Sequence, residues 1–252
     1  MPEEKIKKRE FWWRIKALLL TAILIMFIGA AGYWLYFSSF WEIRAVEVVG
    51  LNKINQEEFS NQLKSQVASN NFWSWPSGDF SVKDFPLLAS IYIDKHFLKR
   101  SITINAQERE AMGIWCFYPG GGQECYWFDE GGIIFEQAPK SASGLIITVE
   151  DVSANLRAAI GEILIDKSLW TNLKAILDSW LLDDLNVAMV ALDRFNKELT
   201  MENGSGFKVL FSLKFDPRLN LAALKKARDD GLVNFNRLGY ADLRVENRIY
   251  YK

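Results

Sequence analysis

Residues 17–41 read ALLLTAILIMFIGAAGYWLYFSSFW, a run of twenty-five positions without a charged side chain. About 20 apolar residues in an α-helix are enough to cross the hydrocarbon core of a bilayer, which is about 30 Å thick. Trp12 and Trp13 precede the run, and Tyr33 and Trp34 lie near its end, a pattern typical of the aromatic belts at the two membrane interfaces. The sequence therefore predicts one transmembrane helix over 17–41.

The residues before this run indicate its orientation. Residues 1–16 hold six basic and three acidic side chains, and basic residues beside a first span stay in the cytoplasm. We therefore expect 1–16 to be a cytoplasmic tail and everything after 41 to lie outside the cytoplasmic membrane. A signal peptide cleaved near Gly29–Ala31 is the alternative, but the apolar run continues to Phe37, which disfavours cleavage.

The composition of the chain excludes several classes of function. There are 252 residues, with 30 Lys and Arg against 31 Asp and Glu, one His and two Cys. A nearly neutral chain attracts nucleic acid weakly, and so few His and Cys leave no ligand set for common zinc, haem or iron–sulfur sites. We expect no metal, no cofactor, no nucleic-acid partner and no small-molecule substrate.

The two cysteines lie on either side of a turn-forming stretch. Cys116 and Cys125 bracket 119–122, which reads PGGG and could fold its flanks into a hairpin. In an oxidising compartment a disulfide across so short a loop would contribute about 2 to 3 kcal/mol. Two free thiols are the alternative interpretation.

The segment 42–107 has the pattern of a small α/β domain. Asn55 can cap a helix in which Phe59, Leu63 and Val67 form one apolar face. A second, short helix is expected over 81–90, with Pro86 in its first turn. Strands are expected at 42–49, 91–96 and 101–107, which gives the order β-α-α-β-β.

The segment 108–252 is expected to be a mostly antiparallel β-sheet with helices, which makes the whole chain α+β. One amphipathic helix is expected over 166–185, and another from the cap Asp216 to the terminator Gly231. Strands are expected at 111–116, 125–129, 133–136, 145–149, 187–192, 198–202, 207–213, 240–246 and 248–251.

Four short segments follow the predicted span in a fixed order. They are the strand with Val46, Val48 and Gly50, the segment EREAMGIW at 108–115, the segment FDEGGIIF at 128–135, and DLR at 242–244. In this order behind a single span, the chain resembles the bacterial cell-division proteins FtsQ and DivIB. The departures from that pattern are Ala111 where the family has proline, the cysteine hairpin after Trp115, and Val245 where an aromatic residue often follows.

The resemblance implies a tail, one span, a POTRA domain over 42–107 and an FtsQ-type β domain over 108–252. It also implies a non-enzymatic scaffold at the division septum that binds the single-span proteins FtsB and FtsL. A route for such binding is strand addition at the edge of a sheet. The candidate contact residues are Asp242, Arg244, Val245, Glu246, Arg248, Ile249, Tyr250 and Tyr251. The alternative is that these residues only complete the core and form a solvent-exposed edge of the sheet.

Two other functions are weighed against this one. A membrane-anchored cell-wall enzyme would need catalytic groups, and no metalloprotease, serine-hydrolase or phosphate-loop motif is present. Glu108 and Glu110 are expected to lie on a solvent-exposed strand edge, and His96 is expected to end a strand. A POTRA protein of envelope transport or assembly would need a long barrel. The aromatic stretch 72–75 is expected either to pack in the core or to form a surface near the membrane or a partner.

Overall fold

The computed structural model describes residues 2–66, 71–73, 75–139, 146–153 and 159–252. The chain forms two compact units, the first from Met1–Val82 with Leu88–Glu108, and the second from Lys83–Leu87 with Arg109–Lys252. An N-terminal apolar helix and two sheets of mixed direction confirm the α+β class.

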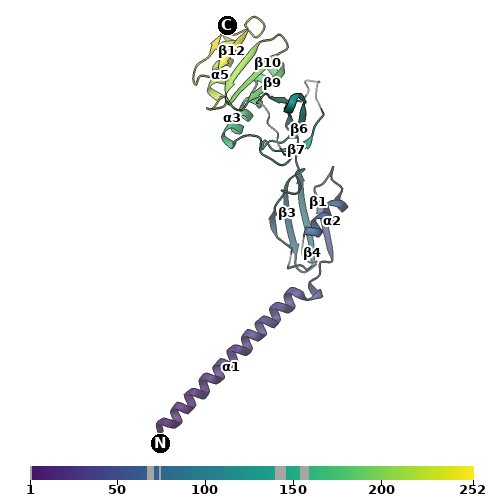
Figure 1. Ribbon diagram of the computed structural model, residues 1–252, viewed down its shortest axis with the longest axis vertical. Helices are drawn as coiled ribbons and strands as arrows, with labels where there is room; N and C mark the ends of the chain where they lie inside the picture. The colour runs from purple at the N-terminus through teal and green to yellow at the C-terminus, as the bar shows by residue number, and fades with distance from the viewer. Residues whose placement is uncertain (1, 67–70, 74, 140–145, 154–158) are drawn as a thin grey trace. The chain divides into compact units, whose positions relative to one another are not determined.

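Helix α1 (Pro2–Phe37) is long and unbroken (Figure 1). Its stretch Trp12–Trp34 is long and apolar enough to cross a membrane, by the same criteria of length and composition that a signal sequence also meets. The expected end of the helix at Trp41 is wrong. Residues Ser39–Trp41 form a separate 3-10 turn, because Trp41 is buried against Trp73 and Phe97 in the small domain.

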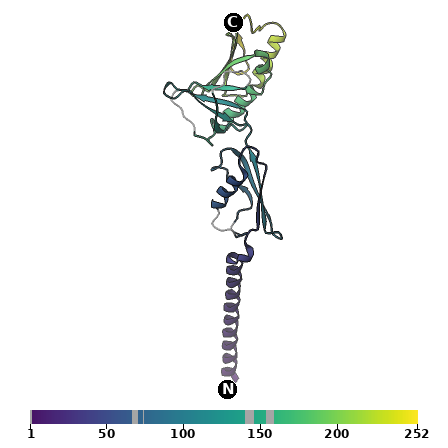
Figure 2. The same cartoon turned by 90° about the vertical axis from the view of Figure 1, so that its right-hand side faces the viewer.

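The small domain is a four-stranded sheet with α2 (Gln56–Gln66) on one side of it (Figure 2). Its strand order is β1-β4-β3-β2, and only β1 and β4 run parallel. The side chain of Asn55 accepts the N–H of Glu57, which confirms the predicted cap. The strands are β1 (Ala45–Val49), β2 (Gly78–Phe80), β3 (Leu88–His96) and β4 (Ser101–Glu108).

The short helix expected over 81–90 is wrong. These residues form turns and then enter β3, and the additional strand β2 lies just before them. Proline lacks an N–H and disfavours helical backbone in the residue before it, so Phe85 and Pro86 keep the segment out of a helix. Among the described residues the order is therefore β-α-β-β-β; Val67 of the expected helical face lies outside them.

The second unit contains a nine-stranded sheet in the order β13-β12-β11-β10-β9-β8-β5-β6-β7. Five of its eight neighbouring pairs are antiparallel and three are parallel, so the sheet is more mixed than expected. Its strands are β5 (Gly113–Phe117), β6 (Glu124–Phe128), β7 (Ile134–Gln137), β8 (Thr148–Asp151), β9 (Val187–Asp193), β10 (Glu198–Asn203), β11 (Lys208–Ser212), β12 (Tyr240–Leu243) and β13 (Tyr250–Tyr251).

Helices α3 (Lys167–Leu177), α4 (Leu181–Leu185) and α5 (Arg218–Asp229) share one core with alternate residues of these strands. They therefore cover one face of the sheet. The single helix expected over 166–185 is broken, because the hydroxyl of Ser179 donates to the carbonyl of Ile176 and competes with helical pairing. Before α5, the side chain of Asp216 accepts the N–H of Arg218, as the sequence predicts for a cap.

Candidate interaction surface at the β13 edge

The nine-stranded sheet has two edges, and they differ in how far they are covered. At β7, the N–H of Ile134 donates to Glu162 and its carbonyl accepts from Gly161, so a neighbouring segment shields that edge. At the other end β13 pairs only with β12 in the described part of the chain. The β13 edge is the more open of the two.

The register of β13 decides which backbone groups face outward. Tyr240 and Lys252 exchange both of their N–H to carbonyl hydrogen bonds, at 3.2 Å each. In an antiparallel pair, the backbone N–H and carbonyl groups of every second residue point toward the partner strand, and those of the residues between them point away from it. The N–H and carbonyl of Tyr251 are therefore directed away from β12, as a further strand would require.

The two tyrosines of β13 lie on opposite faces of this edge. Tyr250 is opposite Asp242, and Tyr251 is opposite Ala241, which belongs to the helix-covered core. Both tyrosine side chains are exposed. A strand added at this edge would therefore meet an aromatic ring on each face.

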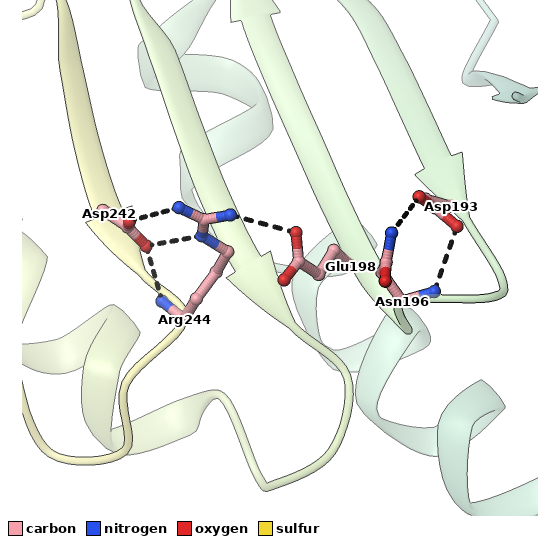
Figure 3. A network of polar contacts seen from close by, with 5 residues as sticks. All are labelled: Asp193, Asn196, Glu198, Asp242 and Arg244. Carbon is pink, nitrogen blue, oxygen red and sulfur yellow. Dashed lines mark hydrogen bonds and ion pairs between the residues drawn. The ribbon is translucent and has the colours of Figure 1, made fainter.

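Arg244 is held by acidic groups on two strands (Figure 3). Its guanidinium donates to both oxygens of Asp242, at 3.0 and 2.7 Å, and to Glu198 on β10 at 3.0 Å. These bonds raise the pKa of Arg244 above its ordinary value, and the hydrogen bonds from Arg244 lower the pKa of Asp242. Arg244 is thus already paired within the sheet, and its main contribution is to tie β12 to β10 across β11.

The loop from β12 to β13 is fixed by a buried amide of α5. The side-chain nitrogen of Asn220 donates to the carbonyls of Leu243 and Val245, both at 3.0 Å, and its oxygen accepts the N–H of Asn247 at 3.0 Å. Asn247 has a positive φ of 59°, which marks a tight reversal. Sequence reasoning missed Asn220 and Glu198. The signal for Asn220 would have been a polar residue on the apolar stripe of its helix.

The other expected contact residues lie on this loop or at the edge. Val245, Glu246 and Arg248 are exposed, whereas Ile249 packs partly against the core. A bond to the hydroxyl of Tyr250 raises the pKa of the Arg248 guanidinium. The structure thus brings together the loop residues and both tyrosines, and it assigns Ile249 to packing.

A continuous row of side chains crosses the sheet face opposite the helices. Strand register aligns Tyr250 with Asp242, Leu210, Thr200, Ala191, Glu150, Cys116 and Cys125 in turn. Cys116 and Cys125 are joined by a disulfide and pack with Ile114 and Ala138. The row between the disulfide and Tyr250 is half-buried.

Two of the three side chains considered for catalysis, Glu108 and His96, have structural partners. Glu108 accepts the backbone N–H groups of Asn52, Lys53 and Ile54 at 2.8 to 3.0 Å, and Glu110 is exposed. His96 ends β3 and lies 3.1 Å from the hydroxyl of Thr103. No group of three or more His, Cys, Asp or Glu side chains that could hold a metal ion occurs among the residues described.

The chain matches no model of a known protein family and no curated protein.

Proposed function

We propose that this chain is a non-enzymatic, membrane-anchored scaffold of the bacterial division machinery, of the FtsQ and DivIB type. In this proposal α1 is the span, the four-stranded domain is a POTRA domain, and the nine-stranded unit is the partner-binding β domain. The proposed setting is the division septum, with the N-terminus in the cytoplasm and both domains outside. The proposed partners are single-span proteins of the FtsB and FtsL type.

The observation that carries the proposal is the outward-facing backbone of Tyr251 at the open β13 edge. Strand addition uses such backbone groups for affinity and side-chain contacts for specificity. Tyr250 and Tyr251 supply exposed aromatic anchors, a residue type enriched at binding hot spots. Of the two arginines among the expected contact residues, Arg244 is paired with acidic groups inside the sheet, whereas Arg248 is exposed and bonds the hydroxyl of Tyr250, so Arg248 is the more accessible to a partner.

The direct test compares Tyr251→Pro with Tyr251→Ala in the full chain. Both variants lose the ring, but only proline lacks the N–H that faces outward. Proline is tolerated on edge strands, and this N–H serves no bond to β12, so the fold should survive. The full chain is coexpressed with the FtsB- and FtsL-type proteins of the same bacterium, and their co-purification is measured.

We expect the proline variant to capture its partners about tenfold less well than the alanine variant, the size of one net hydrogen bond. Equal capture by both folded variants would reject strand addition at this edge. The septal role has its own test, in which a fluorescent fusion should gather at mid-cell. A uniform envelope signal throughout the cell cycle would contradict that role.

A further inference from the structure

An aromatic cluster lies in the first unit where the chain leaves α1. Trp41 is its centre, with ring centroids 5.5 Å from Trp73 and 5.1 Å from Phe97. Phe40 contacts Trp41 at 5.2 Å and stacks with Trp34, the last residue of the candidate span, at 6.2 Å. The cluster is therefore continuous with the end of the apolar helix.

Only the inner part of this cluster is accounted for by packing. Trp41 and Phe72 are buried. Trp73, Phe97 and Phe40 are 44%, 48% and 55% exposed, and Leu98 at the β3–β4 turn is 96% exposed. Exposed apolar groups gathered in one patch usually mark a surface that contacts a protein or a membrane.

Basic side chains accompany the exposed rings. The guanidinium of Arg100 lies 4.8 Å from the Phe40 ring centroid and donates to the Phe40 carbonyl. Lys99 is exposed beside Leu98, whereas Lys95 lies 5.3 Å from the centroid of the buried Phe72 ring and donates to the Phe72 carbonyl. Aromatic rings with Lys and Arg are the composition of a bilayer interface, where rings lie at headgroup level and cations meet lipid phosphates.

Chain length keeps this surface near the bilayer. Five residues lie between Trp34 and Phe40, and even a fully extended chain from one to the other spans only about 20 Å. We propose that Phe40, Trp73, Phe97 and Leu98 dock into the interfacial layer of the leaflet from which α1 emerges, with Lys99 and Arg100 facing lipid phosphates. The occupant of this surface is the bilayer itself. The inference rests on α1 being a retained anchor and is independent of the division role.

The test uses the full chain in nanodiscs that contain phosphatidylcholine and phosphatidylglycerol. A nitroxide is placed at Leu98→Cys, and its collisions with oxygen, which enters lipid, and with a water-soluble nickel chelate are measured by electron paramagnetic resonance. The native cysteines are joined in a disulfide and do not take the label. Lys53→Cys is the matched control, since Lys53 is exposed and lies beside Glu108, at the other end of β4.

We expect the oxygen-to-nickel collision ratio at position 98 to exceed that at position 53 at least threefold. The same ratio at both positions in an inserted chain would overturn this inference alone. Shielding of position 98 from both reagents would mean that protein covers the patch, and would overturn the lipid assignment. Failure of the chain to co-elute with nanodiscs would overturn the anchor and this inference together.

Discussion

Arg109 and Asp129 form an ion pair in the second unit, with side chains only 9% and 12% exposed. Arg109 also donates to the carbonyl of Pro86, and Asp129 accepts the N–H groups of Gly131 and Ile133 at the β6–β7 turn. The pair therefore joins the segment at 108–115 to the hairpin at 128–135. Those two segments are among the pieces on which the family resemblance rests.

We predict that Asp129→Ala lowers the free energy of unfolding of the second unit by about 3 to 5 kcal/mol, because it leaves a buried guanidinium without its partner. The change also frees two backbone donors of the hairpin turn. Urea unfolding of the full chain in detergent measures this. The double variant Arg109→Met with Asp129→Leu should recover much of the loss; an equally unstable double variant would contradict the assignment to an unpaired charge.

The Gly132→Ala change should also destabilise this hairpin. Gly132 has a φ of +74°, and a Cβ there would lie 2.7 Å from the Trp170 ring. We expect a loss of about 2 to 4 kcal/mol from backbone strain and overpacking together. Gly206→Ala is the control, because Gly206 has a φ of +88° but open space around its Cβ position. Equal losses at the two positions would show that the ring contact is unimportant.

The sequence predicts the positions of individual helices and strands better than it predicts the order, register and contacts of those elements in the fold. The alternation around Ile102 and Ile104 predicts β4, and Asn55 predicts the start of α2, because both signals are local. The break between α3 and α4 was missed, because a strong apolar stripe predicts one continuous helix and a single serine gives no clear sign of the Ser179 bond that interrupts it. Strand order is not encoded locally either. Register alone makes Tyr251 the outward residue, and a residue far along the chain, Glu198, completes the partners of Arg244.

The bonds to Glu108 predict a pH-dependent contribution to stability. Partial burial acts to raise the pKa of Glu108, but three backbone N–H groups and Lys53 outweigh it and lower the pKa below its ordinary value. A pKa lowered on folding gives stabilisation that is present above the unfolded pKa, about 4.3, and is lost as the pH falls through the folded pKa. Glu108→Gln should therefore melt at a lower temperature than wild type at pH 7 and approach it below about pH 4. A difference in melting temperature that does not change with pH would contradict this.

Reduction of the disulfide between Cys116 and Cys125 should lower the free energy of unfolding by about 2 to 3 kcal/mol, given a loop of this length. The cysteines also pack with Ile114 and Ala138 on the sheet face away from the helices. The measurement is urea unfolding with and without reductant. A Cys116→Ala and Cys125→Ala double variant should resemble the reduced protein and should not respond to reductant.

The Asn220→Ala change should lower the stability of the second unit and loosen the pairing of β13 with β12. The amide is buried and bonds Leu243, Val245 and Asn247, so its loss removes one bond from each of the two carbonyls and from the N–H of Asn247. The Val245 carbonyl still accepts the N–H of Arg248. We expect about 2 to 4 kcal/mol less stability. Leu219→Ala, at an exposed neighbour on the same helix, should change stability by less than about 0.5 kcal/mol.

Because the loop sets the position of β13, hydrogen exchange at Tyr250 and Lys252 should accelerate in Asn220→Ala and stay unchanged in Leu219→Ala. Unchanged exchange in both variants would show that the loop held by Asn220 does not set the position of β13.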